Sequence, residues 1–121
     1  MNEPTTLVTE ERPSGVTIVR FQSDLDSMGT HLVEDQFDAA VANSAGDVIA
    51  DLGRVGFISS AGMAMLLVRG KALRKRGARL SLAAASPRVL EVLSLAGFNE
   101  LFEVYPTLEA ALAALEAPPQ S

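Results

Sequence analysis

The middle of the chain joins a nearly continuous apolar run to a long helical pattern through two glycines and a pair of serines. The run at 48–52 has the composition of a strand that is buried on both faces of a covered sheet. After Ser59 and Ser60, apolar residues recur three and four positions apart, which predicts a helix over about 61–76. The two serines therefore lie where a strand passes into a helix. This order favours an α/β fold.

Strands and helices alternate through the rest of the sequence. Four further segments have strand patterns, and the first two of them suggest an opening hairpin. Three further segments have helical spacing, and we expect Thr30 to cap the first of these helices. Such alternation is typical of a single small, mixed, mostly parallel β-sheet flanked by about four helices. The further predicted strands are 7–10, 16–21, 80–84 and 102–105, and the further predicted helices are 31–44, 87–96 and 107–117.

The length of 121 residues corresponds to one domain, 1–121, with its core at about 7–115 and flexible tails at 1–6 and 117–121. Apolar residues make up 48% of the chain and aromatic residues only 5%, so we expect an aliphatic core. The absence of cysteine excludes disulfides and thiolate chemistry. No signal peptide is evident and no apolar run is long enough to span a membrane, so a cytoplasmic location is expected.

Basic residues gather between Arg69 and Arg79, although the net charge is −5. Such a cluster can bind anions or nucleic acid, or it can be the solvated face and cationic last turn of a helix. No aromatic residue is interleaved with the cluster, and the negative net charge disfavours nucleic-acid binding. We therefore favour the helix interpretation and expect no direct contact with nucleic acid.

Asp24 and Asp26 lie two residues apart in a polar loop ahead of the first predicted helix. Paired aspartates can contribute to a metal site, but no further ligands follow at the spacing of a calcium loop. Loop polarity and helix capping are the favoured interpretation. His31 is the only histidine, so the sequence indicates neither a metal site nor any cofactor.

Ser59 and Ser60 offer more than one kind of chemistry. A serine at a helix start can cap the helix, or it can carry a phosphate that the helix N-terminus stabilises. A hydrolase would need the Gly-x-Ser-x-Gly turn, but Ile58 occupies the first glycine position around Ser60, and a triad would have to recruit His31 from a distant helix. Hydrolysis is therefore the least favoured interpretation.

The segment 51–63, with its Phe-Ile-Ser-Ser-Ala-Gly-Met end, resembles the signature of STAS domains, specifically of the bacterial anti-sigma factor antagonists. The similarity extends over about residues 7–115. Four other segments match the family pattern in the same order: the Ser-Asp-Leu-Asp loop at 23–26, and the segments 76–80, 86–98 and 102–110.

The resemblance implies that Ser60 is the phosphoacceptor, with Ser59 less favoured, and that a partner anti-sigma factor of the GHKL serine-kinase type phosphorylates it. It implies that the unphosphorylated form binds this kinase and so releases a sigma factor, and that a PP2C-type phosphatase removes the phosphate. Ser59 stands where the family usually has Asp, and Ala61 stands in place of a second Ser or Thr. The expected partner-binding residues are Asp26, Ser59, Ser60, Ala61, Gly62 and Met63.

Two functional alternatives follow. The first is a phosphorylation-switched antagonist that is no enzyme itself and is a monomer or weak dimer. The second is a STAS-type scaffold or accessory subunit of a stress-signalling or lipid-transport complex, with no phosphoswitch, which the changes at Ser59 and Ala61 motivate. We favour the first.

Overall fold

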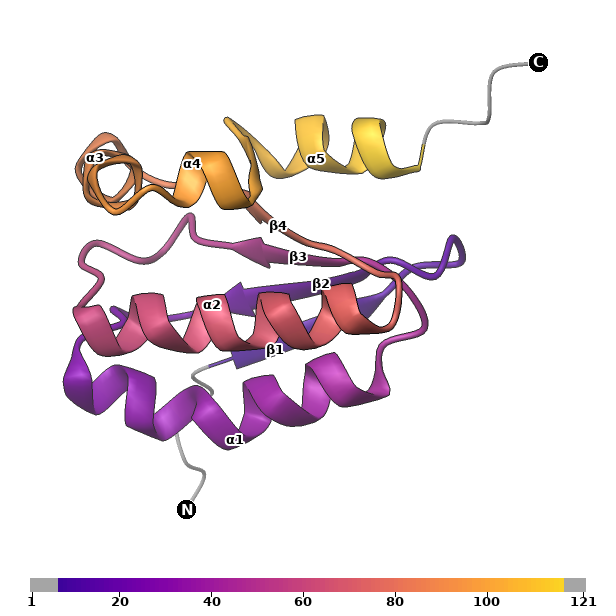
Figure 1. Cartoon of the computed structure of the whole chain (residues 1–121), viewed down its shortest axis with the longest axis horizontal. Coiled ribbons are helices and arrows are strands. Elements are labelled where there is room, and N and C mark those ends of the chain that lie inside the picture. The colour runs from indigo at the N-terminus through magenta and orange to yellow at the C-terminus, as the bar shows by residue number, and fades with distance from the viewer. Residues whose placement is uncertain (1–6, 117–121) are drawn as a thin grey trace.

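The computed structural model describes residues 7–116, which form a five-stranded sheet and five helices. The predicted tails 1–6 and 117–121 lie outside the described residues. Figure 1 shows α1 and α2 side by side at one side of the molecule, with α3, α4 and α5 gathered at the other. In chain order the elements are β1 (Leu7–Glu11), β2 (Thr17–Phe21), α1 (Ser27–Asn43), β3 (Val48–Asp51), α2 (Ser60–Lys75), β4 (Leu80–Ala83), α3 (Pro87–Leu95), α4 (Phe98–Leu101), β5 (Glu103–Tyr105) and α5 (Leu108–Leu115).

The strands lie in chain order, β1-β2-β3-β4-β5. β1 pairs antiparallel with β2 in the predicted hairpin, and the other pairs are parallel. Each parallel connection contains at least one helix, as crossovers between parallel strands require. The prediction of a mixed, mostly parallel sheet is therefore confirmed.

One face of the sheet carries the larger core. Because side chains alternate along a strand, Val19, Phe21 and Ala50 point to the same face and pack there with buried residues of α1, α2 and α3. Phe37 of α1 is fully buried, and its ring meets that of Phe21 edge to face, with centroids 5.3 Å apart. This core holds α1 and α2 against the sheet, and the two serines lie at the start of α2.

Among the helices within residues 7–116, α5 is the one that packs on the opposite face. Ile18, Ile49 and Ala83 are fully buried there against Ala111 and its apolar neighbours on α5. A short run of apolar residues on α5 is therefore enough to bury the centre of this face, which is why the chain needs a helix after its last strand.

An ionic contact fixes the end of α5 to the opening hairpin. Arg12 donates two hydrogen bonds to the Glu116 carboxylate, at 3.1 and 3.0 Å, and the Ser14 hydroxyl donates a third at 2.6 Å. Hydrogen bonds from Arg12 and then from Ser14 lower the pKa of Glu116, so its carboxylate stays charged to lower pH than an isolated glutamate. This contact joins residues that are about a hundred positions apart in the sequence.

One helix starts earlier than predicted from the sequence, and one short helix was not predicted. α1 begins at Ser27, and Asp26 caps it, so the expectation that Thr30 is the cap is wrong. A glycine at 29 allows this earlier start, because a side chain there would collide with the backbone of Asp24. The short helix α4 begins with the buried Phe98 and ends with Leu101, which is 45% exposed.

Among the described residues, no helix is both long enough and apolar enough to cross a lipid bilayer.

Candidate functional site

The loop before α1 and the loop before α2 are held together at one end of the sheet. Leu25 and Ile58 form an isolated parallel bridge, in which the Leu25 N–H donates to the Phe57 carbonyl at 2.9 Å and the Ser59 N–H donates to the Leu25 carbonyl at 2.9 Å. Asp24 adds a further link, because its carboxylate accepts from the Gly56 N–H at 2.7 Å. The starts of α1 and α2 are therefore parts of one connected surface.

The carbonyl of Leu25 is the centre of this connection. Besides the Ser59 N–H, it accepts from the Ser59 hydroxyl at 2.8 Å and from the Thr30 hydroxyl at 3.2 Å. Leu25 itself is fully buried. Thr30, which does not cap α1, thus helps to fix the loop that α2 packs against. Sequence reasoning assigned Thr30 to the helix cap and gave Leu25 no role of its own, since neither residue belongs to a local motif that predicts this contact.

Ser59 is the N-cap of α2, and its hydroxyl is used twice. It accepts from the Gly62 N–H at 3.2 Å while donating to the Leu25 carbonyl. These are the two roles that a hydroxyl can fill at a helix start. The capping function considered for the serine pair therefore belongs to Ser59.

Ser60 is the first residue of α2 and is exposed. Within residues 7–116 its hydroxyl has no hydrogen-bond partner, in contrast to that of Ser59. Of the N–H groups at the helix start, those of Ser59 and Gly62 are already bonded, which leaves those of Ser60 and Ala61 directed out of the helix end. A negative group on Ser60 would meet these N–H groups and the positive end of the helix dipole.

The other predicted partner-binding residues lie around Ser60 with different exposures. Ala61 is exposed, Met63 is half-buried against the core, and Gly62 is buried. A Cβ at Gly62 would lie 2.9 Å from the Leu25 carbonyl oxygen, so this glycine allows α2 to approach the neighbouring loop. Asp26 is exposed and accepts from the Gly29 N–H at 2.7 Å as the cap of α1.

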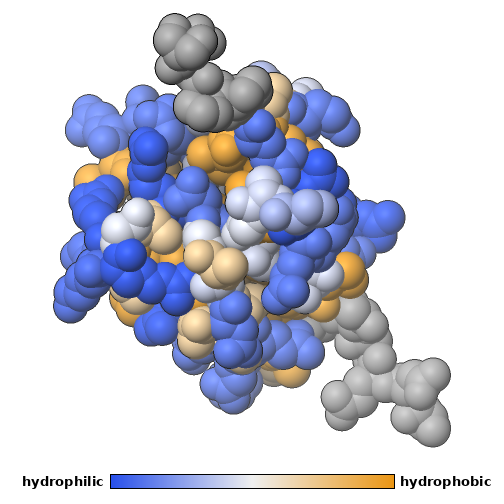
Figure 2. Space-filling model, turned by 90° about the vertical axis from the view of Figure 1, so that its right-hand side faces the viewer, coloured by the Kyte–Doolittle hydropathy of each residue, from blue (hydrophilic) through white to orange (hydrophobic). Residues whose placement is uncertain are grey.

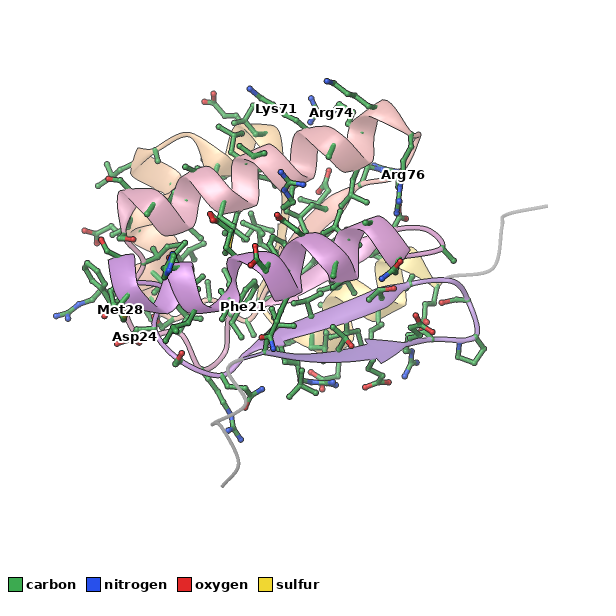
Figure 3. All side chains as sticks on the ribbon, turned by 90° about the horizontal axis from the view of Figure 1, so that it is seen from below. Phe21, Asp24, Met28, Lys71, Arg74 and Arg76 are labelled. Carbon is green, nitrogen blue, oxygen red and sulfur yellow. The ribbon has the colours of Figure 1, made fainter. Side chains whose placement is uncertain are left out.

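Large apolar side chains are exposed on the two joined segments. Phe57 is 51% exposed, and Met28 and Leu32 on α1 are more exposed still. Figure 3 shows Met28 and Asp24 close together at the start of α1. The opposite end of the molecule has a mainly hydrophilic surface (Figure 2). Exposed apolar groups next to a free hydroxyl are typical of a surface that binds another protein.

The two aspartates near the site are engaged with backbone groups. Among the described residues, no three His, Cys, Asp or Glu side chains are grouped so that they could hold a metal ion. Asp24 and Asp26, considered as metal ligands, each accept a backbone N–H instead.

Replacing Ser59 with Ala is expected to lower the free energy of unfolding by about 1 kcal/mol, because the helix loses its cap. Ser60→Ala is the matched control and should leave the stability within about 0.5 kcal/mol of the wild type, since the Ser60 side chain is exposed. Urea unfolding of the three proteins measures both changes. Equal stability of Ser59→Ala and Ser60→Ala would contradict the assignment of the cap.

Known proteins share both this sequence and this arrangement. The family model described as STAS domain matches residues 8–111. The chain is similar to BtrV of Bordetella bronchiseptica, which is named as an anti-sigma factor antagonist. The two are 34% identical over 109 residues, which cover 90% of this chain and 94% of BtrV. A crystal structure of an anti-sigma factor antagonist from Mycobacterium paratuberculosis superimposes with a TM-score of 0.83 at 29% identity, covering 92% of this chain and 93% of that one.

The fold is also that of SpoIIAA, an anti-sigma factor antagonist whose structure is known in its unphosphorylated form and, for Bacillus, in its phosphorylated form. The unphosphorylated structure superimposes with a TM-score of 0.78 at 21% identity, covering 94% of this chain and 99% of that one. The family match spans most of the sequence, and the sheet order and site loops described above lie within it. The chain therefore belongs to the STAS domain family.

Proposed function

We propose that this chain is an anti-sigma factor antagonist whose binding to an anti-sigma factor is switched by phosphorylation of Ser60. The proposal rests mainly on the different environments of the two serine hydroxyls. The Ser59 hydroxyl is engaged as both donor and acceptor, whereas the Ser60 hydroxyl is exposed at the first position of α2. Relatives that cover nearly the whole chain are anti-sigma factor antagonists, which supports a partner of that class.

A phosphate on Ser60 would change the surface and leave the fold intact. It would add about −1.5 to −2 charges at neutral pH. The unbonded N–H groups of Ser60 and Ala61 and the helix dipole favour negative charge at this position. A partner seated over the Ser60 hydroxyl would instead face a bulky, strongly hydrated anion. The unphosphorylated chain is therefore the binding form in this proposal.

In this proposal, other proteins add the phosphate to Ser60 and remove it. We propose that the anti-sigma factor is itself a GHKL-type serine kinase, that a PP2C-type phosphatase reverses the modification, and that the exchange takes place in the cytoplasm. These assignments rest on the family resemblance of the segment 51–63. No catalytic group on the chain itself is needed.

The proposal is tested by a pull-down from a lysate of the source cells, with and without ATP, using wild type, Ser60→Ala and Ser59→Ala as baits. Mass spectrometry of bait and prey identifies the partner and locates the phosphate. Without ATP we expect an anti-sigma kinase on all three baits. With ATP, wild type and Ser59→Ala should gain phosphate and lose the kinase, whereas Ser60→Ala should gain none and keep it. Two results would instead support the scaffold alternative. One is that no bait captures an anti-sigma factor, and the other is that all three baits hold the same partners with neither serine phosphorylated.

A further inference from the structure

α2 has two exposed flanks of different character. The flank toward α1 contains Ala61 and Val68 beside the carboxylates of Glu34 and Asp38, and Arg69 on this flank is paired with Asp38 at 3.1 Å. The flank toward α4 contains Leu67, Lys71 and Arg74. Figure 3 shows Lys71 and Arg74 projecting from α2 on the side away from α1.

A hollow of about 180 Å³ lies on the second flank, between α2 and the α4 segment. We call it the α2–α4 hollow; its lining residues are Leu67, Gly70, Lys71, Arg74, Leu101 and Phe102. Apolar side chains form most of this lining, and the Leu101 side chain is 45% exposed at its edge. Gly70 leaves room for the Phe102 ring, because a side chain at 70 would collide with it.

The two charged side chains in the lining of the α2–α4 hollow, Lys71 and Arg74, are both positive. Neither Lys71 nor Arg74 forms an ion pair within the part of the chain that the structure describes, and Arg74 donates only to the neutral Leu101 carbonyl, at 3.2 Å. The carboxylates of Glu100 and Glu103 line an adjoining hollow, which shares Arg74 and Phe102 with this one and also contains Arg79, whereas Lys71 lines the α2–α4 hollow alone of the two. An apolar floor with cations at its edge complements an apolar side chain that is flanked by carboxylates.

Ser60 lies in line with this hollow. Leu67 follows Ser60 by seven residues and Lys71 follows it by eleven, which correspond to about two and three turns of an α-helix. The three positions therefore share one flank of α2. A partner segment that covers Ser60 along this flank also reaches the α2–α4 hollow.

We propose that the α2–α4 hollow docks an acidic amphipathic segment of the anti-sigma factor, which inserts an apolar side chain and pairs carboxylates with Lys71 and Arg74. This inference rests on the proposed function, because it names the chemistry of the partner at the same interface. It also explains the direction of the switch. Carboxylates that run along α2 are attracted by Lys71 and Arg74 and are repelled by a phosphate on Ser60.

The test measures the association rate and the Kd for the purified anti-sigma factor that the pull-down identifies, at low and high salt. Lys71→Glu changes the charge at the hollow, and Lys75→Glu makes the same change on the same helix outside the lining. Leu101→Ser removes the apolar edge, and Leu95→Ser, at a side chain that is 82% exposed outside the lining, is its control. Circular dichroism shows that each variant is folded.

We expect Lys71→Glu to weaken binding roughly tenfold, mostly through a slower association rate with a reduced salt dependence, because the partner's carboxylates then face a like charge. Leu101→Ser should weaken binding at both salt concentrations, and the two controls should bind as wild type does. Equal effects of Lys71→Glu and Lys75→Glu, or no effect of Lys71→Glu, would overturn the docking site and leave the proposed function standing. Failure of the wild type to bind an anti-sigma factor would overturn both.

Discussion

Ser60→Asp is expected to weaken binding of the anti-sigma factor by about a hundredfold or more, whereas Ser60→Ala should bind as the wild type does. The exposed hydroxyl has no hydrogen bond to lose within the described residues, so Ala removes little. Asp places an unpaired charge at the centre of the interface, and a hundredfold change corresponds to about 2.7 kcal/mol, within the range for a charge left unpaired on binding.

Isothermal titration calorimetry of each unphosphorylated variant with the anti-sigma factor measures these affinities. Ser59→Thr is a suitable control, because threonine keeps both a donor and an acceptor at the cap. Tight binding of Ser60→Asp would contradict the switch at this position. A large loss of affinity in Ser60→Ala would show that the hydroxyl itself contacts the partner.

Phe37→Ala is expected to lower the free energy of unfolding by about 3–5 kcal/mol, the largest stability change proposed for this chain. Phe37 is fully buried, and its ring packs edge to face on Phe21. Truncation removes this contact and leaves a cavity between α1 and the sheet. A loss of this size is a large fraction of the stability of a typical domain.

Urea unfolding measures the change, with Leu95→Ala as the control. The Leu95 side chain is 82% exposed, so its truncation should alter the stability by no more than about 0.5 kcal/mol. A cost below about 1 kcal/mol for Phe37→Ala would mean that α1 is not held to the sheet as the structure describes.

Local signals predicted most of the fold. The apolar run at 48–52 is a central buried strand, and Ser86 caps α3 with Pro87 at its first position. Gly77 follows the end of α2 with a φ of +82°, a conformation that glycine adopts without strain. Each of these features depends on residues that are neighbours in the chain, so the local sequence is sufficient to specify them.

Contacts between distant residues were less predictable. Thr30 looks like a helix cap by type and position, but its hydroxyl bonds to the Leu25 carbonyl while Asp26 caps α1. The loop that brings these residues together is fixed by pairing with the loop before α2, more than thirty positions away. Local propensity therefore could not rank the two candidate caps.

The two serines illustrate which features the sequence predicts and which depend on the tertiary structure. The sequence alone determined that Ser59 and Ser60 lie at the junction between a buried strand and a helix, because periodicity and the loop glycines are local properties. Only the tertiary structure decided their separate roles. The Leu25 carbonyl lies where it can accept the Ser59 hydroxyl, while Ser60, one residue further along the helix, points its hydroxyl away from that loop to the exposed surface.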